Sequence, residues 1–67
     1  MEIIINSQPR DCVNDITIST LLGETIGSKQ NGIAVAVNDM VIPKSKWESF
    51  ELKSHDTVLI IKATQGG

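Results

Sequence analysis

The sequence ends in two glycines, Gly66 and Gly67, and this pair is its strongest chemical feature. A C-terminal carboxylate is a poor electrophile until it is activated, for example as an acyl-adenylate formed with ATP. Glycine has no Cβ, so the backbone of such an end fits a narrow channel and adopts the dihedral angles that the channel requires. Residues 63–67 are expected to form a flexible tail with a reach of at most about 17 Å. On its own, the glycine pair is equally compatible with an inert chain end.

Two other residues with reactive side chains have more ordinary interpretations. Cys12 is the only cysteine, and no basic residue closer than Arg10 would favour its thiolate. A small buried hydrophobic residue in the second strand is therefore favoured over a sulfur-relay thiol. His55 has no companion His or Cys at the spacing of a metal site, which favours a turn residue and predicts no bound metal. A lone cysteine also excludes an internal disulfide and fits a reducing compartment such as the cytoplasm.

Length and composition limit the remaining possibilities. A chain of 67 residues with 40% apolar and 21% charged residues is typical of one small globular domain. The net charge is −2 and the basic residues are scattered, so nucleic acid is not expected as a partner. No apolar run approaches the ~20 residues that span a bilayer, and the N-terminus lacks the features of a signal peptide. We expect a cytoplasmic protein that does not insert into membranes.

Hydrophobic periodicity predicts the elements that position the tail. In the first half, we expect a strand over 2–6, a turn over 7–9, a second strand over 10–14, and a helix. Thr17 is the expected N-cap of this helix and Gly27 its C-cap, and the apolar stripe comprises Ile18, Leu21, Leu22 and Ile26.

In the second half, residues 28–32 are expected to form a polar loop. A continuous apolar run over 33–37 predicts a strand buried on both faces, or nearly so. A turn at Asn38-Asp39 leads to a short strand over 40–42 that ends at Pro43. A single helical turn is expected near Trp47, whose side chain is expected to cap the edge of the core rather than to anchor a partner. The last strand is predicted over 57–62.

This order predicts an α+β fold with a single mixed sheet and one helix packed across one of its faces. If the first and last strands pair in parallel at the centre, the arrangement is the ubiquitin-like β-grasp. Residues 1–62 then form the β-grasp domain, and residues 63–67 form the tail.

The sequence resembles the family of sulfur carriers of thiamine biosynthesis (ThiS), which are ubiquitin-like β-grasp proteins. The resemblance runs over nearly the whole chain and is carried by five short segments in the family's order. These are Gln8-Pro9-Arg10, Thr17-Ile18-Ser19-Thr20-Leu21-Leu22, Ala34-Val35-Ala36-Val37-Asn38, Val41-Ile42-Pro43-Lys44-Ser45-Lys46-Trp47 and Gly66-Gly67. The fourth is similar to the family's Val-Pro-Arg-x-x-Trp segment.

The resemblance implies a protein that is a co-substrate of partner enzymes and not itself an enzyme. A ThiF-like adenylyltransferase would activate the carboxylate of Gly67 with ATP, and a persulfide sulfur donor would displace AMP to give a thiocarboxylate. A ThiG-like thiazole synthase would then take the sulfur. Thr64, Gln65 and Gly66 would enter the partner's active site with Gly67. The carrier would bind no cofactor, since ATP and the sulfur donor are used by the partners.

Two positions depart from the family's pattern. The family has a Gly-Asp turn before its last strand, where this chain has His55-Asp56, which puts only the local turn geometry in doubt. Thr20 stands where a complete capping box would have Glu or Gln, which affects the capping of the helix.

Two alternatives remain at the level of function. The small subunit of molybdopterin synthase and carriers for tRNA thiolation share the fold and the terminal glycines, although the Pro43–Trp47 segment and the short chain favour the thiamine carrier. In a different class, the chain would be a β-grasp binding module with an inert tail.

Strand alternation also predicts a docking surface. Ile3 and Ile5 should share a face with Val58 and Ile60, and this leaves a patch on the helix-free side if the first and last strands are neighbours. The patch comprises Ile4, Leu59 and Ile61. Such a patch is typical of an interaction site, although scattered surface hydrophobes would give the same pattern.

Overall fold

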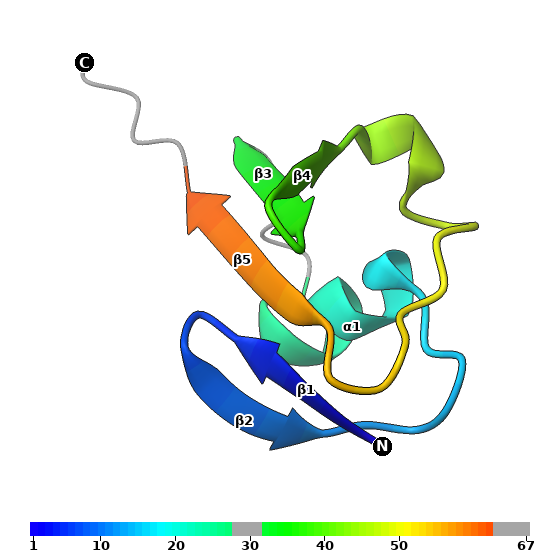
Figure 1. Cartoon of the computed structure of the whole chain (residues 1–67). Coiled ribbons are helices and arrows are strands. Elements are labelled where there is room, and N and C mark those ends of the chain that lie inside the picture. The colour runs from blue at the N-terminus through cyan, green and yellow to red at the C-terminus, as the bar shows by residue number, and fades with distance from the viewer. Residues whose placement is uncertain (28–31, 63–67) are drawn as a thin grey trace.

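The computed structural model describes residues 1–27 and 32–62. Its elements follow one another as two strands, a helix, two strands, a short 3-10 helix and a last strand (Figure 1). They are β1 (Glu2–Ile5), β2 (Gln8–Asp11), α1 (Ile18–Thr25), β3 (Ile33–Val37), β4 (Met40–Ile42), η1 (Lys44–Lys46) and β5 (Thr57–Lys62). The predicted tail over 63–67 and most of the predicted loop over 28–32 lie outside the described residues.

The five strands form one mixed sheet in the order β2-β1-β5-β3-β4. β1 runs parallel to β5, with Ile4 opposite Thr57 and Ile5 opposite Val58, whereas all other neighbouring strands are antiparallel. The parallel pairing of the first and last strands is therefore confirmed. Figure 1 shows α1 crossing one face of this sheet, so the predicted α+β architecture is correct.

The helix forms where the sequence predicts it and for the predicted reason. Thr17 has extended backbone dihedral angles, and its hydroxyl accepts a hydrogen bond from the backbone N–H of Thr20 at 3.2 Å. The backbone N–H groups of Ile18 and Ser19 are at the start of the helix and have no acceptor within it. The Ile18 N–H donates to the Phe50 carbonyl, and the Ser19 N–H donates to the Trp47 carbonyl. At the other end, the C-cap is Ile26 and not Gly27 as predicted. Gly27 is the next residue and has a positive φ of 65°, as the glycine that follows a helix end commonly does.

The core lies between the sheet and the helix. Its residues are mostly aliphatic, and they come from α1, from four of the strands and from the irregular segments on either side. They are Ile3, Ile16, Ile18, Leu21, Leu22, Val35, Val37, Ile42, Trp47, Leu52 and Val58. Trp47 is more deeply placed than predicted, with 4% of its surface exposed. Its indole N–H donates to the Ile42 carbonyl at 3.0 Å, which allows the ring to lie within the core and not only at its edge.

The predicted position of the first hairpin turn was wrong. The turn is Asn6-Ser7, with φ values of 49° and 70°, and Pro9 lies inside β2. The Cys12 N–H donates to the Met1 carbonyl, so Met1 and Cys12 form a hydrogen-bonded pair. Pairs with and without hydrogen bonds alternate along an antiparallel ladder, which makes Ile4 and Pro9 a pair without hydrogen bonds. The missing N–H of Pro9 therefore faces the outer edge of the sheet, where it costs no ladder bond.

The shift of the hairpin also changes the environment of Cys12. β2 ends at Asp11, so Cys12 lies just beyond the strand and not within it. Its side chain is half-buried and packs against the core cluster. Cys12 was expected to be a small buried hydrophobic residue, and this expectation is met only in part because its side chain is half-buried.

The expectation that the strand over 33–37 is buried on both faces also holds only in part. Val35, Ala36 and Val37 are buried, whereas Ala34 is exposed. Ala36 lies opposite both Leu59 and Val41, and these larger neighbours flank its small side chain on the helix-free face. The other turns are as predicted: Asn38-Asp39 joins β3 to β4 with positive φ values, and His55 has a φ of 70° before β5.

Candidate functional site

The predicted reactive end of the chain is carried by β5, the central strand of the sheet. β5 lies between β1 and β3 and ends at Lys62, five residues before Gly67 in the sequence. Thr64, Gln65, Gly66 and Gly67 themselves lie outside the described residues. The structure therefore defines the strand that leads to the terminal glycines and the surfaces around that strand.

The beginning of β5 is held by a compact polar network. The amide of Asn38 donates to one carboxylate oxygen of Asp56 at 3.0 Å, and the backbone N–H of Lys53 donates to the other at 2.8 Å. The Thr57 N–H donates to the side-chain oxygen of Asn38 at 3.0 Å. The turn between β3 and β4 is thus tied to the start of the last strand, which fixes the position from which that strand runs toward the C-terminus.

The middle of β5 is held by Asn6. The backbone N–H of Asn6 donates to the Val58 carbonyl at 2.9 Å, and the Ile60 N–H donates to the side-chain oxygen of Asn6 at 2.8 Å. The Asn6 side chain takes the place that a backbone carbonyl would have if β1 continued. Sequence analysis did not find this role, because no local signal reports a bond between residues so far apart in the sequence.

The faces of β1 and β5 are oriented as predicted. Ile3 and Val58 are buried on the helix side, whereas Leu59 and Ile61 are each 47% exposed on the opposite side. Ile4 is half-buried on that same opposite side, since its neighbour Ile5 lies opposite Val58. The structure therefore brings Ile4, Leu59 and Ile61 together on the helix-free face of two adjacent strands.

One residue of this surface was missed. Val41 is 68% exposed and, like Leu59, lies opposite Ala36, so it extends the same face across β3 to β4. The signal was present in the sequence, because Ile42 packs into the core and alternation places Val41 on the other side. We call Ile4, Val41, Leu59 and Ile61 the open-face patch.

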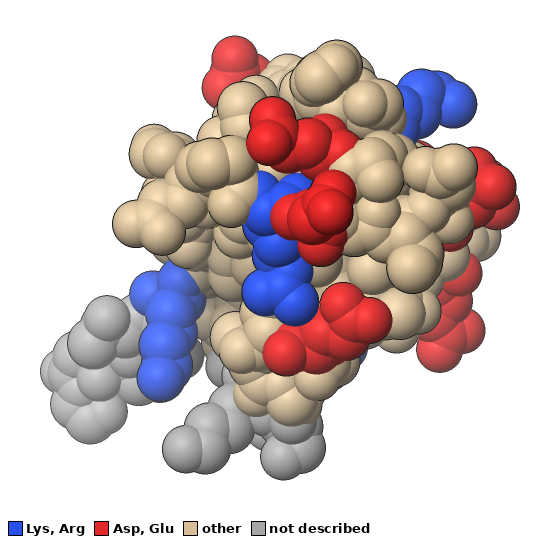
Figure 2. Space-filling view, turned by 90° about the horizontal axis from the view of Figure 1, so that it is seen from below, with Lys and Arg blue, Asp and Glu red and all other residues tan. Residues whose placement is uncertain are grey.

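The other candidate residues have structural roles in the fold. His55 is a turn residue whose backbone N–H donates to the Glu2 carbonyl at 2.7 Å. The part of the chain that the structure describes holds no cluster of three or more His, Cys, Asp or Glu residues suited to a metal ion. Acidic and basic side chains are interspersed on the face seen in Figure 2.

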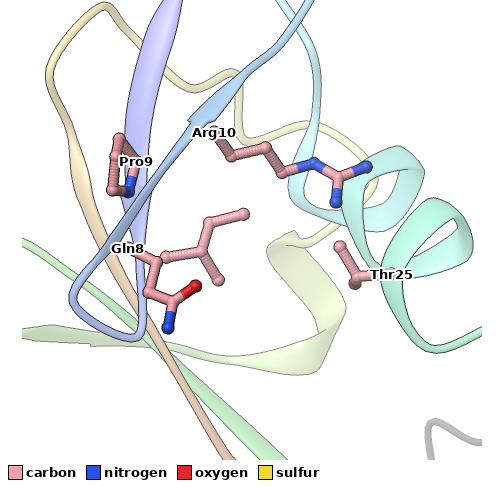
Figure 3. A pocket seen from close by; sticks show the side chains of 5 residues that line it. Gln8, Pro9, Arg10 and Thr25 are labelled. Carbon is pink, nitrogen blue, oxygen red and sulfur yellow. The ribbon is translucent and has the colours of Figure 1, made fainter.

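A hollow of about 250 Å³ lies between β2 and α1 and is lined by Ile5, Gln8, Pro9, Arg10 and Thr25 (Figure 3). Two of its polar side chains already have partners within the chain. The Arg10 guanidinium lies 3.6 Å from the Glu24 carboxylate, and the Thr25 hydroxyl donates to the Leu21 carbonyl at 2.9 Å. The hollow is on the helix side of the sheet, away from the open-face patch, and we assign it no part in the site.

The fold and the site together define a class. One mixed sheet with parallel first and last strands at its centre, one helix across one face, and a central last strand that leads to two glycines make a β-grasp protein of the ubiquitin-like kind. No helix among residues 1–27 and 32–62 has the length and apolar character needed to span a membrane.

Comparisons with known proteins narrow this class. The sequence model of the ThiS family matches residues 3–67. The sulfur carrier protein ThiS of Escherichia coli (strain K12) is 30% identical over 67 residues, with 100% of both chains covered. The chain belongs to the ThiS family.

Solved structures agree on the fold. A crystal structure of the thiamine biosynthesis protein ThiS from Geobacter metallireducens aligns with a TM-score of 0.87 at 19% identity, over 100% of both chains. A solution structure of a thiamine biosynthesis protein from the same organism aligns with a TM-score of 0.79 at 20% identity and covers 100% of this chain and 88% of that chain.

Proposed function

We propose that this chain is a sulfur carrier in thiamine biosynthesis and that its reactive group is the C-terminal carboxylate of Gly67. The observation that carries the proposal is the family match, which extends through the terminal glycines to residue 67. The fold supports it, because the central strand β5 leads to these glycines from a firmly held position. In this role the chain is a co-substrate and not an enzyme, and the catalytic groups belong to its partners.

The proposed chemistry has three steps. In the first, a ThiF-like adenylyltransferase lets a carboxylate oxygen of Gly67 attack the α-phosphate of ATP, which releases pyrophosphate and forms an acyl-adenylate. In the second, the terminal sulfur of a persulfide donor attacks the acyl carbon and AMP leaves. A further thiol then cleaves the resulting acyl disulfide and frees the thiocarboxylate. In the third, a ThiG-like thiazole synthase accepts the sulfur. Because the first step consumes ATP, we place the cycle in the cytoplasm.

The open-face patch is the proposed docking surface for the adenylyltransferase. Leu59 and Ile61 are half-exposed aliphatic side chains on the strand that leads into the tail. A partner that covers them, together with Ile4 and Val41, would direct Thr64, Gln65, Gly66 and Gly67 into its nucleotide site. Apolar surface of this kind is typical of protein interfaces.

Deletion of Gly66 and Gly67 separates function from folding. The deletion should abolish ATP–pyrophosphate exchange with the cognate adenylyltransferase, because the acceptor carboxylate is then displaced from the nucleotide site. The thermal midpoint should stay almost unchanged, because no residue after Ala63 has an apolar side chain. Exchange at the wild-type rate by the shortened chain would contradict the proposal.

The same assay separates the alternatives. A carrier of molybdopterin synthesis or of tRNA thiolation would be a better substrate for the activating enzyme of its own pathway than for the ThiF-like enzyme. A binding module with an inert tail would support exchange with none of them.

A further inference from the structure

The side of β5 that faces β1 is only partly covered. Thr57, Leu59 and Ile61 lie opposite Asn38, Ala36 and Ala34, and the hydrogen bond from the Asn38 N–H to the Thr57 carbonyl at 2.8 Å fixes the phase of this ladder. Alternation then turns the backbone N–H and carbonyl groups of Val58, Ile60 and Lys62 toward the β1 side.

On that side, β1 ends too early to pair with all of them. Its last ladder positions are the Asn6 N–H, which donates to the Val58 carbonyl, and the Asn6 side-chain oxygen, which accepts from the Ile60 N–H. Figure 1 shows the end of β5 projecting beyond the β1–β2 turn. The Ile60 carbonyl and the N–H and carbonyl of Lys62 have no hydrogen-bond partner among the described residues. We call these three groups the open edge.

The open edge differs from the two outer edges of the sheet. β2 carries Pro9, Arg10 and Asp11, and all four of its residues are exposed, so proline and charge discourage the addition of a strand there. β4 has only three residues, and so short an edge offers few backbone groups with which another strand could pair. The open edge instead continues the central strand, and it lies between the half-exposed Ile61 on one face and the half-buried Ile60 on the other.

We propose that an extended segment of the activating enzyme adds to the open edge as a short β-strand. Backbone hydrogen bonds to Ile60 and Lys62 would hold the segment, and its alternate side chains would contact Ile61 on the open face. The exposed ammonium of Lys62 favours an acidic residue in that segment. The inference rests on the proposed function and adds to it, because an extra strand beside Ile60–Lys62 would fix the direction in which the chain leaves the sheet toward Gly67.

Amide hydrogen exchange measured by NMR tests this pairing without a mutation. In the free chain, the Lys62 N–H should exchange rapidly and the Leu59 N–H slowly, because Leu59 belongs to the ladder with β3. In the complex with the cognate ThiF-like adenylyltransferase, exchange at Lys62 should slow by roughly tenfold or more, while Leu59 serves as the internal control. Unchanged exchange at Lys62 in the saturated complex would overturn the proposal.

Two variants of Lys62 give an independent measurement. Lys62→Pro removes the N–H, while its backbone makes no ladder bond with Ile33 opposite, so folding should be kept. Lys62→Ala removes the same charge but keeps the N–H. Affinity for the adenylyltransferase should be roughly tenfold or more weaker for Lys62→Pro than for Lys62→Ala, at equal thermal midpoints.

Equal affinities of the two folded variants would overturn the open-edge proposal. If Lys62→Pro does not fold, the exchange measurement on the wild-type chain decides alone. Failure of the proposed function has a different signature, since the wild-type chain would then give no ATP–pyrophosphate exchange with the same enzyme.

Discussion

The two faces of the central strands, β1 and β5, carry the same kinds of side chain but differ in how far these side chains are buried. Ile3 and Ile4 are adjacent and chemically identical, yet Ile3 is fully buried and Ile4 is only half-buried. In β5, Val58 is 1% exposed and its neighbour Leu59 is 47% exposed. The difference arises because α1 and the 43–56 segment cover only one face of the sheet.

This difference in burial means that the two faces contribute unequally to the stability of the fold. Burial of a medium aliphatic side chain is worth about 1.5–3 kcal/mol, so the helix face supplies most of the stability of a small domain. The open face repeats the aliphatic composition without that gain, and two of its residues belong to β5, which precedes residues 63–67 in the sequence. The open-face patch is therefore the part of the sheet where an apolar partner would find aliphatic side chains that the fold itself does not bury.

The sharpest test of the comparison is a pair of identical substitutions at adjacent positions. Val58→Glu places a carboxylate in the core and should cost about 3 kcal/mol or more, enough to unfold much of a domain of this size. Leu59→Glu should change the free energy of unfolding by less than about 1 kcal/mol. Urea denaturation of both variants measures the contrast. Similar losses at the two positions would mean that the faces of β5 do not differ in this way.

The next effect concerns binding. Leu59→Glu removes an apolar contact and puts a charge into the proposed interface, so affinity for the adenylyltransferase should fall by roughly tenfold or more. Titration calorimetry with the folded variant measures the dissociation constant. Glu51→Gln, an exposed change outside the open-face patch, is the matched control and should bind as the wild type does. Unchanged affinity of Leu59→Glu would remove the patch from the interface.

A smaller effect is expected at the helix that creates the difference between the faces. Thr17→Ala removes the hydroxyl that accepts from the Thr20 N–H, which should cost about 1 kcal/mol and lower the thermal midpoint by about 4–8 °C. Thr17→Ser keeps the hydroxyl and should stay close to the wild type. Equal losses in both variants would show that the hydroxyl is not what stabilises the helix end.

The smallest effect is expected at the turn before β5. His55 has a φ of 70°, a conformation that glycine adopts without steric cost. His55→Gly should therefore raise the free energy of unfolding by about 0.5–1 kcal/mol, whereas His55→Ala should give no gain. A loss of stability in His55→Gly would mean that the side chain contributes more than the strain it brings.

Local signals in the sequence were sufficient for most of the fold. The helix start at Thr17 and the strand over 57–62 were predicted correctly, because a capping residue marks the first and a run rich in β-branched residues marks the second. The first hairpin was misplaced because Pro9 was interpreted as a turn residue. Only the register of the ladder reveals that its missing N–H faces the edge of the sheet.

The site was predictable to a different extent. The open-face orientation of Ile4, Leu59 and Ile61 follows from alternation alone, once β1 and β5 are neighbours. The role of Asn6 could not be predicted, since its side chain bonds to Ile60 across a long separation in sequence. The interior position of Trp47 also depends on a tertiary contact, the hydrogen bond to Ile42.

The central claim is that Gly67 carries the sulfur, and intact-protein mass spectrometry tests it most directly. The chain would be incubated with ATP, the cognate adenylyltransferase and a persulfide donor, with a parallel sample lacking ATP as the control. We expect the mass change of one oxygen replaced by one sulfur, located at Gly67 by fragmentation and present only with ATP. An unmodified C-terminus after incubation with enzymes of proven activity would contradict the account.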